Sequence, residues 1–115
     1  MKDDLAYLKY IVEGIERIQQ YTAEGKEVFL ANSMIQDATL RRLQTLAEST
    51  QRLSEELKVR ATEIDWRGIS GIRNILVHDY LGGIDLYIVW NVIERDLPEL
   101  KRKIEAILRE LKEKE

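Results

Sequence analysis

Apolar side chains recur every three or four residues along most of the chain, which is the spacing of one face of an α-helix. The first such stripe contains Leu5, Leu8, Ile11, Ile15 and Ile18. No segment alternates apolar and polar residues as a half-buried β-strand would. Six Gly and one Pro are also too few for a turn-rich β protein. The pattern therefore predicts an all-α fold.

Residues that begin or end helices divide this pattern into segments. We predict a first helix from Asp3 or Asp4, either of which can cap it, to about residue 22, with Gly25 marking its end. A second helical stretch covers about residues 26–59. Because Ser49 and Thr50 are poor residues for a helix interior, we expect that stretch to break near residues 48–50.

The second half of the chain shows clearer boundaries. Residues 58–64 are predicted to be a connection, followed by a helix that Asp65 caps and that Gly82 and Gly83 end. Asp85 is predicted to cap the next helix. The chain should then reset at residues 96–98, where one helix ends and the final helix begins, since Pro98 suits the first turn of a helix.

The chain of 115 residues has the length of one ordinary domain. With short loops between its helices, it predicts a single domain over residues 1–115, built as an antiparallel, up-and-down bundle of four to five helices.

Composition excludes several classes of site. There is no Cys and one His, so we expect no metal and no cofactor. No apolar run approaches the roughly 20 residues that span a bilayer, and Met-Lys-Asp-Asp at the start lacks the apolar stretch of a signal peptide. We therefore expect a cytoplasmic protein without a membrane partner. The net charge of −3 means that any RNA site must be a local pocket.

The most informative segment is residues 71–80, Gly-Ile-Arg-Asn-Ile-Leu-Val-His-Asp-Tyr, which contains the single His. At about 100° per residue, one face of this helix is apolar and the opposite face is polar. The apolar face carries Ile72, Ile75 and Leu76; the polar face carries Arg67, Gly71, Asn74 and His78; Arg73 lies at the border. Gly71 would either admit a ligand closely or make a helix-packing contact.

This set of side chains suits cleavage of an RNA phosphodiester. Imidazole can transfer a proton near neutral pH, and arginine holds phosphate oxygens with a planar, charged fork. RNA supplies its own nucleophile, the 2′-hydroxyl, so positioning, proton transfer and charge stabilisation are sufficient without a metal. Arg73 and His78 are five residues apart, about 140° around the helix. A two-fold dimer would supply a second His and could bring the two side chains to one phosphate.

The segment strongly resembles the signature of the HepT-like toxins of the HEPN superfamily: an Arg, four residues, a His, any residue and a Tyr. Arg73, His78 and Tyr80 match it, within an unbroken Arg-Asn-Ile-Leu-Val-His-Asp-Tyr. Further similarity flanks the signature, at Trp66-Arg67, at Asp85-Leu86 with Val89-Trp90, at residues 96–100, and at Asp37-Ala38 with Arg41. The resemblance spans most of the chain.

The resemblance implies an all-helical homodimer that is a metal-independent endoribonuclease toxin, with Arg73 and His78 as the catalytic pair in the dimer cleft. It also implies a nucleotidyltransferase antitoxin that attaches AMP to Tyr80. A nucleotidylated phenol gains bulk and negative charge and would keep RNA out of the site. Asn74 and Tyr80 would support catalysis, and Arg67 and Arg41 would hold RNA.

Other interpretations remain open. The chain could be a catalytically inactive helical dimer that binds nucleotide or a partner protein, which its acidic net charge favours slightly. It could also act mainly as an acceptor of nucleotidyl groups. Arg73 and His78 could form a structural hydrogen-bond cluster. Asn74 could make only a hydrogen bond on the helix face, and Arg67 could form an ion pair with a neighbouring helix. Tyr80 could be an ordinary tyrosine at the edge of the core.

Overall fold

The computed structural model describes residues 2–78 and 83–113, with Lys2, Ile75, Val77 and His78 described by their backbone alone. Regular structure in these residues is entirely helical: α1 (Lys2–Tyr21), α2 (Lys26–Ala31), α3 (Ser33–Gln51), α4 (Glu55–Arg60), α5 (Trp66–His78), α6 (Leu86–Asn91), a π-helical turn η1 (Val92–Asp96) and α7 (Leu97–Glu113). The all-α prediction is therefore confirmed for the described part of the chain.

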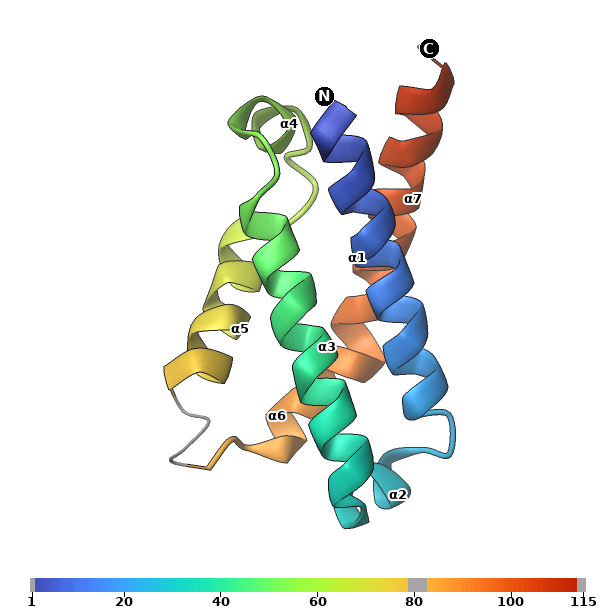
Figure 1. Ribbon diagram of the computed structural model, residues 1–115, viewed down its shortest axis with the longest axis vertical. Coiled ribbons are helices and arrows are strands. Elements are labelled where there is room, and N and C mark those ends of the chain that lie inside the picture. The colour runs from blue at the N-terminus through green and yellow to red at the C-terminus, as the bar shows by residue number, and fades with distance from the viewer. Residues whose placement is uncertain (1, 79–82, 114–115) are drawn as a thin grey trace.

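The four long helices, α1, α3, α5 and α7, alternate in direction and form the predicted up-and-down bundle (Figure 1). Helix α1 packs against α3 and α7, and α3 packs against α5 on its other side. The short α4 lies at the end of the bundle where α1 begins, and α2 and α6 lie at the opposite end (Figure 1). The bundle measures 45 × 28 × 20 Å.

The core forms where the predicted stripes meet. Leu8, Ile11, Ile15 and Ile18 are completely buried on α1, as the spacing predicts. At the end of the bundle that holds α2 and α6, the rings of Phe29 and Trp90 pack with their centroids 5.6 Å apart.

The predicted cap of the first helix is wrong. Helix α1 begins at Lys2, so Asp3 and Asp4 lie within its first turn. Asp4 is instead almost completely buried, and its carboxylate accepts hydrogen bonds from the backbone N–H and the hydroxyl of Ser54, at 2.9 and 2.7 Å. Ser54 in turn caps α4 by accepting from the N–H of Leu57. Asp4 therefore links the start of α1 to the start of α4.

The predicted break at residues 48–50 is also wrong, because α3 continues to Gln51. The hydroxyls of Ser49 and Thr50 donate to the carbonyls of Thr45 and Ala47 in the preceding turn, so both residues are accommodated inside the helix. The chain breaks instead at Asn32, whose side chain caps α3, and at residues 52–54. Part of the predicted connection at residues 58–64 is helical, since α4 extends to Arg60.

The predicted reset at residues 96–98 is confirmed in part, because α7 begins at Leu97 and Pro98 lies in its first turn. The chain does not break there, however. Helix α6 passes through η1 directly into α7, and the N–H of Leu97 donates to the carbonyl of Val92, five residues earlier. Pro98 has no N–H to donate and its ring crowds the carbonyl four residues earlier, which accounts for the wider π turn before it. Asp85 caps α6 as predicted. Of the predicted helix end, Gly82 lies outside the described residues, and Gly83 has a φ of 92°.

Replacing Asp4 by Ala should lower the free energy of unfolding by about 2 kcal/mol, because the partly buried N–H of Ser54 would lose its charged acceptor. Asp3 is exposed one residue earlier and is the matched control. Asp3→Ala should cost about 0.5 kcal/mol, the size of a helix-dipole contact. Urea unfolding followed by circular dichroism measures both variants at one protein concentration. Equal losses would show that the Asp4–Ser54 contact contributes nothing.

Candidate active site

The start of α5 is fixed by three hydrogen bonds. Asp65 caps the helix, accepting from the N–H of Gly68 at 2.8 Å, as the sequence predicts. A Cβ atom at Gly68 would collide with the Asp65 carboxylate, so the cap in this geometry needs glycine there. The indole N–H of Trp66 donates to the carbonyl of Ala61. The third bond comes from Lys103 on α7, whose Nζ lies 2.7 Å from the carbonyl oxygen of Glu63.

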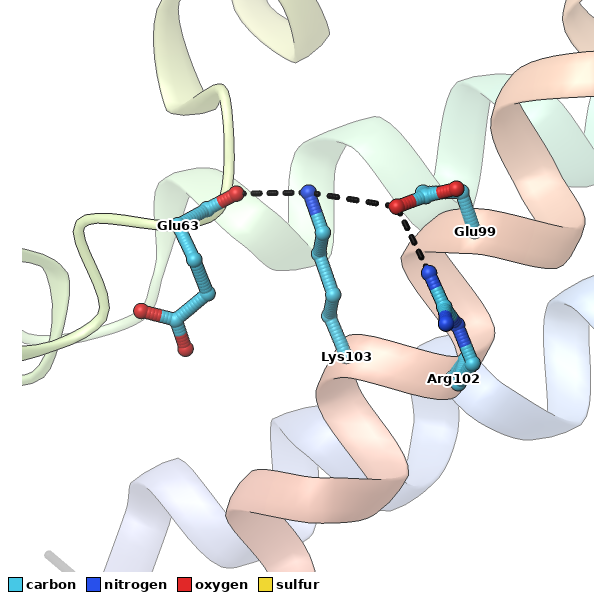
Figure 2. Close-up of polar contacts among 4 residues, drawn as sticks. All are labelled: Glu63, Glu99, Arg102 and Lys103. Carbon is cyan, nitrogen blue, oxygen red and sulfur yellow. Dashed lines mark hydrogen bonds and ion pairs between the residues drawn. The ribbon is translucent and has the colours of Figure 1, made fainter.

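Figure 2 shows how the Lys103 contact is held in place. The same ammonium group lies 3.6 Å from Oε1 of Glu99, and Arg102 donates to that oxygen at 2.7 Å. A pocket of 480 Å³ lies beside this link, between the start of α5, α3 and the η1–α7 segment. Ile69, Ile72 and Leu100 are among its lining residues. Helix α5 is thus tied to α7 at its start, while its length packs against α3.

Helix α5 has the two faces that the sequence predicts. Ile69 and Leu76 are buried, and Ile72 packs against the core. Arg67 and Asn74 on the opposite face are exposed, and open space surrounds the position of a Cβ atom on Gly71. Gly71 therefore does not make the alternative helix-packing contact within the described part of the chain. A ligand or second chain could therefore approach the backbone at Gly71.

Arg73 occupies the border between these faces. Its side chain is partly buried, and its Nε atom is shielded from solvent without a hydrogen-bond partner among the described residues. A buried donor without an acceptor is costly, typically about 1–3 kcal/mol. Among the described side chains Arg73 thus has no partner at Nε, while the alternative of a cluster with His78 stays open, because the His78 side chain lies outside them. An acceptor such as a phosphate would satisfy this guanidinium.

Arg67 and Arg41 are also without polar partners in the described part of the chain. Arg67 is exposed on α5 and Arg41 on α3, and no hydrogen bond or ion pair engages either guanidinium. Arg67 therefore does not form the alternative ion pair with a neighbouring helix. Arg42, beside Arg41, is different: it donates a hydrogen bond to the hydroxyl oxygen of Tyr21, which raises the pKa of Arg42, so its charge is already engaged by α1.

The remaining predicted site residues are only partly described. His78 is the last residue of α5, and its position is known from the backbone alone. Asp79 and Tyr80 lie outside the described residues. Arg73 and His78 are five positions apart, with four helical residues between them, so the two positions lie about 140° apart around a regular helix.

Sequence reasoning missed one polar link beside this face. Gln51 at the end of α3 donates through Nε2 to the hydroxyl of Ser70, at 2.9 Å. Ser70 lies on the edge of α5 that faces α3, because it bonds to Gln51 there. It precedes Arg73 by one helical turn. The sequence shows that both residues are polar and lie in predicted helices. It does not show that they contact each other, because that depends on how α3 and α5 pack.

No group of three or more His, Cys, Asp or Glu side chains lies close enough to hold a metal ion among residues 2–78 and 83–113. No helix in that part of the chain is long and apolar enough to cross a membrane.

A family model described as ribonuclease HepT-like matches residues 11–107, which include α5 and the whole segment 71–80. The chain belongs to this family. The resemblance inferred from Arg73, His78 and Tyr80 is thereby confirmed at the level of the family.

Three curated relatives illustrate the range of this HepT-like family. A Methanocaldococcus jannaschii protein, named as a gamma-glutamylcyclotransferase and candidate RNase, is 36% identical over 111 residues, which is 96% of this chain and 50% of that protein. A candidate ribonuclease HepT of Thermococcus cleftensis is 34% identical over 102 residues, 88% of this chain and 92% of its own. A candidate RNase of Caldanaerobacter subterraneus subsp. tengcongensis is 28% identical over 113 residues, 97% of this chain and 100% of its own.

The chain thus spans half the length of the Methanocaldococcus protein. No solved structure matches the chain significantly.

Replacing Arg73 by Met in this HepT-like chain should leave the free energy of unfolding unchanged or raise it by about 1 kcal/mol, because Met fills similar space without the unpaired buried donor. Leu76→Ala, on the buried side of the same helix, should lower it by about 2–5 kcal/mol. Urea unfolding compares the variants at one protein concentration. A loss above about 1 kcal/mol for Arg73→Met would show that the guanidinium stabilises the free protein.

Proposed function

We propose that this HepT-like chain is a metal-independent endoribonuclease that acts as the toxin of a toxin–antitoxin pair. Its membership of the ribonuclease HepT-like family supports RNA as the substrate. The observation that carries the proposal is the guanidinium of Arg73, which is partly buried with an unpaired Nε. Arg67 and Asn74 are exposed on the adjoining face of the same helix. Such a set of donors fits a phosphodiester.

In this proposal the 2′-hydroxyl of RNA attacks the neighbouring phosphorus. His78 takes the proton from that hydroxyl or gives one to the leaving 5′-oxygen. Arg73 stabilises the charge that develops on the phosphate oxygens, and the Nε donor would gain its missing acceptor at that moment. Asn74 lies one turn before His78 and orients the imidazole or the substrate. No step in this sequence requires a metal ion.

The active form in this proposal is a homodimer. The outward face of α5, with Arg67, Gly71 and Asn74, has no partner within the described part of one chain. One His per chain cannot serve as base and acid at once, whereas a two-fold axis beside this face would bring two His78 residues together. Within one chain, Arg73 and His78 lie about 140° apart around α5. The same two-fold axis would let Arg73 of one chain and His78 of the other approach one phosphate.

Control of such an enzyme would fall to a nucleotidyltransferase antitoxin in the same cytoplasm. Tyr80 follows His78 by two residues and would accept AMP on its hydroxyl. The added phosphate would carry negative charge and acceptor oxygens, and would compete with RNA for the guanidinium of Arg73.

A catalytically inactive dimer that binds nucleotide or a partner protein is the second candidate. The net charge of −3 favours it, because an acidic protein attracts RNA weakly over long distances. Both candidates use the same face of α5, so cleavage distinguishes them and binding alone does not.

Cleavage of total RNA in the presence of EDTA should be complete with the wild type and reduced at least about 100-fold in His78→Ala, since general acid–base catalysis contributes about 10²–10⁴-fold. Asp65→Asn, which keeps a capping side chain on the same helix, is the control and should retain activity. Sedimentation at the assay concentration reports the oligomeric state. A wild type that cuts fully as a monomer would exclude the dimer, and one that never cuts would favour the inactive dimer.

Co-expression with a cognate nucleotidyltransferase should add the mass of one or more AMP groups to the wild type. Tyr80→Phe should gain none, because it lacks the accepting hydroxyl, while Tyr87→Phe should be modified normally. Intact-mass spectrometry gives the answer directly. Equal modification of Tyr80→Phe would place the acceptor elsewhere in the chain.

A further inference from the structure

A second pocket, of 390 Å³, lies in the groove between α1 and α3. Tyr7 and Tyr10 line it from α1, and Glu48 and Arg52 line it from α3. Helices α1 and α3 lie side by side along this groove (Figure 1). We name these four residues the tyrosine groove. Nothing in the proposed cleavage chemistry uses them.

The chemistry of the tyrosine groove differs from that of a core gap. Tyr7 and Tyr10 are three residues apart on α1, so their rings lie on one side of that helix. Tyr10 is 40% exposed, whereas most large apolar side chains of the bundle are buried. Glu48 offers acceptors and Arg52 offers donors, and no hydrogen bond or ion pair engages either side chain in the described part of the chain. The groove therefore combines aromatic surface with unused polar groups of both kinds.

Its position connects it to the candidate active site. Arg52 directly follows Gln51, which donates to Ser70 on α5. Ser70 lies one turn from Arg73 and Asn74. The tyrosine groove thus lies on the side of α3 that faces α1, while α5 packs on the other side of α3, with on the order of 10 Å between the α3 and α5 axes.

We infer that the tyrosine groove binds a nucleobase of the single-stranded RNA whose scissile phosphate lies at Arg73. The inference rests on the proposed ribonuclease function and deepens it by assigning a subsite for a flanking nucleotide. Unpaired bases are recognised by stacking on aromatic rings and by hydrogen bonds to their edges. Tyr10 supplies the ring, Glu48 accepts from base N–H groups, and Arg52 donates to base or phosphate oxygens.

The subsite would also explain how a chain with an acidic net charge binds RNA. With a net charge of −3, long-range attraction cannot hold an RNA strand. Stacking depends little on net charge or salt, so one stacked base would add affinity that the arginines of α5 alone do not provide. A strand held at two points across α3 would also be oriented relative to Arg73.

The test measures binding of an end-labelled, single-stranded RNA of mixed sequence to His78→Ala protein in EDTA, so that binding is seen without cleavage. In this background Tyr10→Ala should weaken binding about ten-fold, the size of one lost base–aromatic stack. Tyr10→Phe keeps the ring and should bind within about two-fold of the parent. Tyr87→Ala, which removes a tyrosine that is 62% exposed on α6, is the matched control.

Three results would overturn the inference in different ways. Equal affinity of Tyr10→Ala and its parent would exclude the subsite and leave the ribonuclease proposal intact if the wild type still cuts RNA. A change of oligomeric state in Tyr10→Ala without a change of RNA affinity would make the groove a contact between copies of the chain. Absence of both RNA binding by the parent and cleavage by the wild type would remove the proposed function together with the subsite.

Discussion

The packing of α3 between α1 and α5 is the contact on which the rest of the structure depends. Leu40, Leu43 and Leu46 on α3 are buried in the shared core, so both neighbouring helices are oriented by one apolar surface. Helix α5 packs mainly on α3 and is tied to α7 near its start through Lys103 and Glu63 (Figure 2). Its opposite face is consequently left outward, with Arg67 and Asn74 exposed. The candidate site exists because the core occupies only one side of α5.

The helices could be predicted from the sequence because their stripes are local properties of 3.6-residue periodicity. The boundaries that failed depend on other kinds of contact. Asp4 looked like a cap but binds Ser54, fifty residues away in sequence. Ser49 and Thr50 looked like helix breakers, but donate to carbonyls of the preceding turn. Pro98 lies in the first turn of α7 as predicted, but the chain reaches that helix through a π-helical turn and without a break. A single sequence carries no direct signal for any of these.

The candidate site was predictable to the extent that it lies on one helix. The polar face of α5 follows from residue spacing, and the structure confirms it for Arg67 and Asn74. The unpaired Nε of Arg73 could not be predicted, because its shielding depends on the surrounding packing. The Gln51–Ser70 bond and the tyrosine groove likewise arise between helices. The roles of His78 and Tyr80 stay predictions, carried by the sequence signature.

The distribution of partners among the basic residues bears on how an acidic chain could bind the RNA substrate that we propose. Arg60, Lys101, Arg102 and Lys103 are each paired with a glutamate, in contacts that all involve α7. Arg41, Arg67 and Arg73 have no such partner in the described part of the chain. Pairing lowers the attraction of a cation for phosphate, whereas an unpaired guanidinium can engage phosphate oxygens in full. The net charge of the whole chain therefore does not describe the α3–α5 side, where α3 and α5 together carry four arginines against two carboxylates, Asp37 and Glu48.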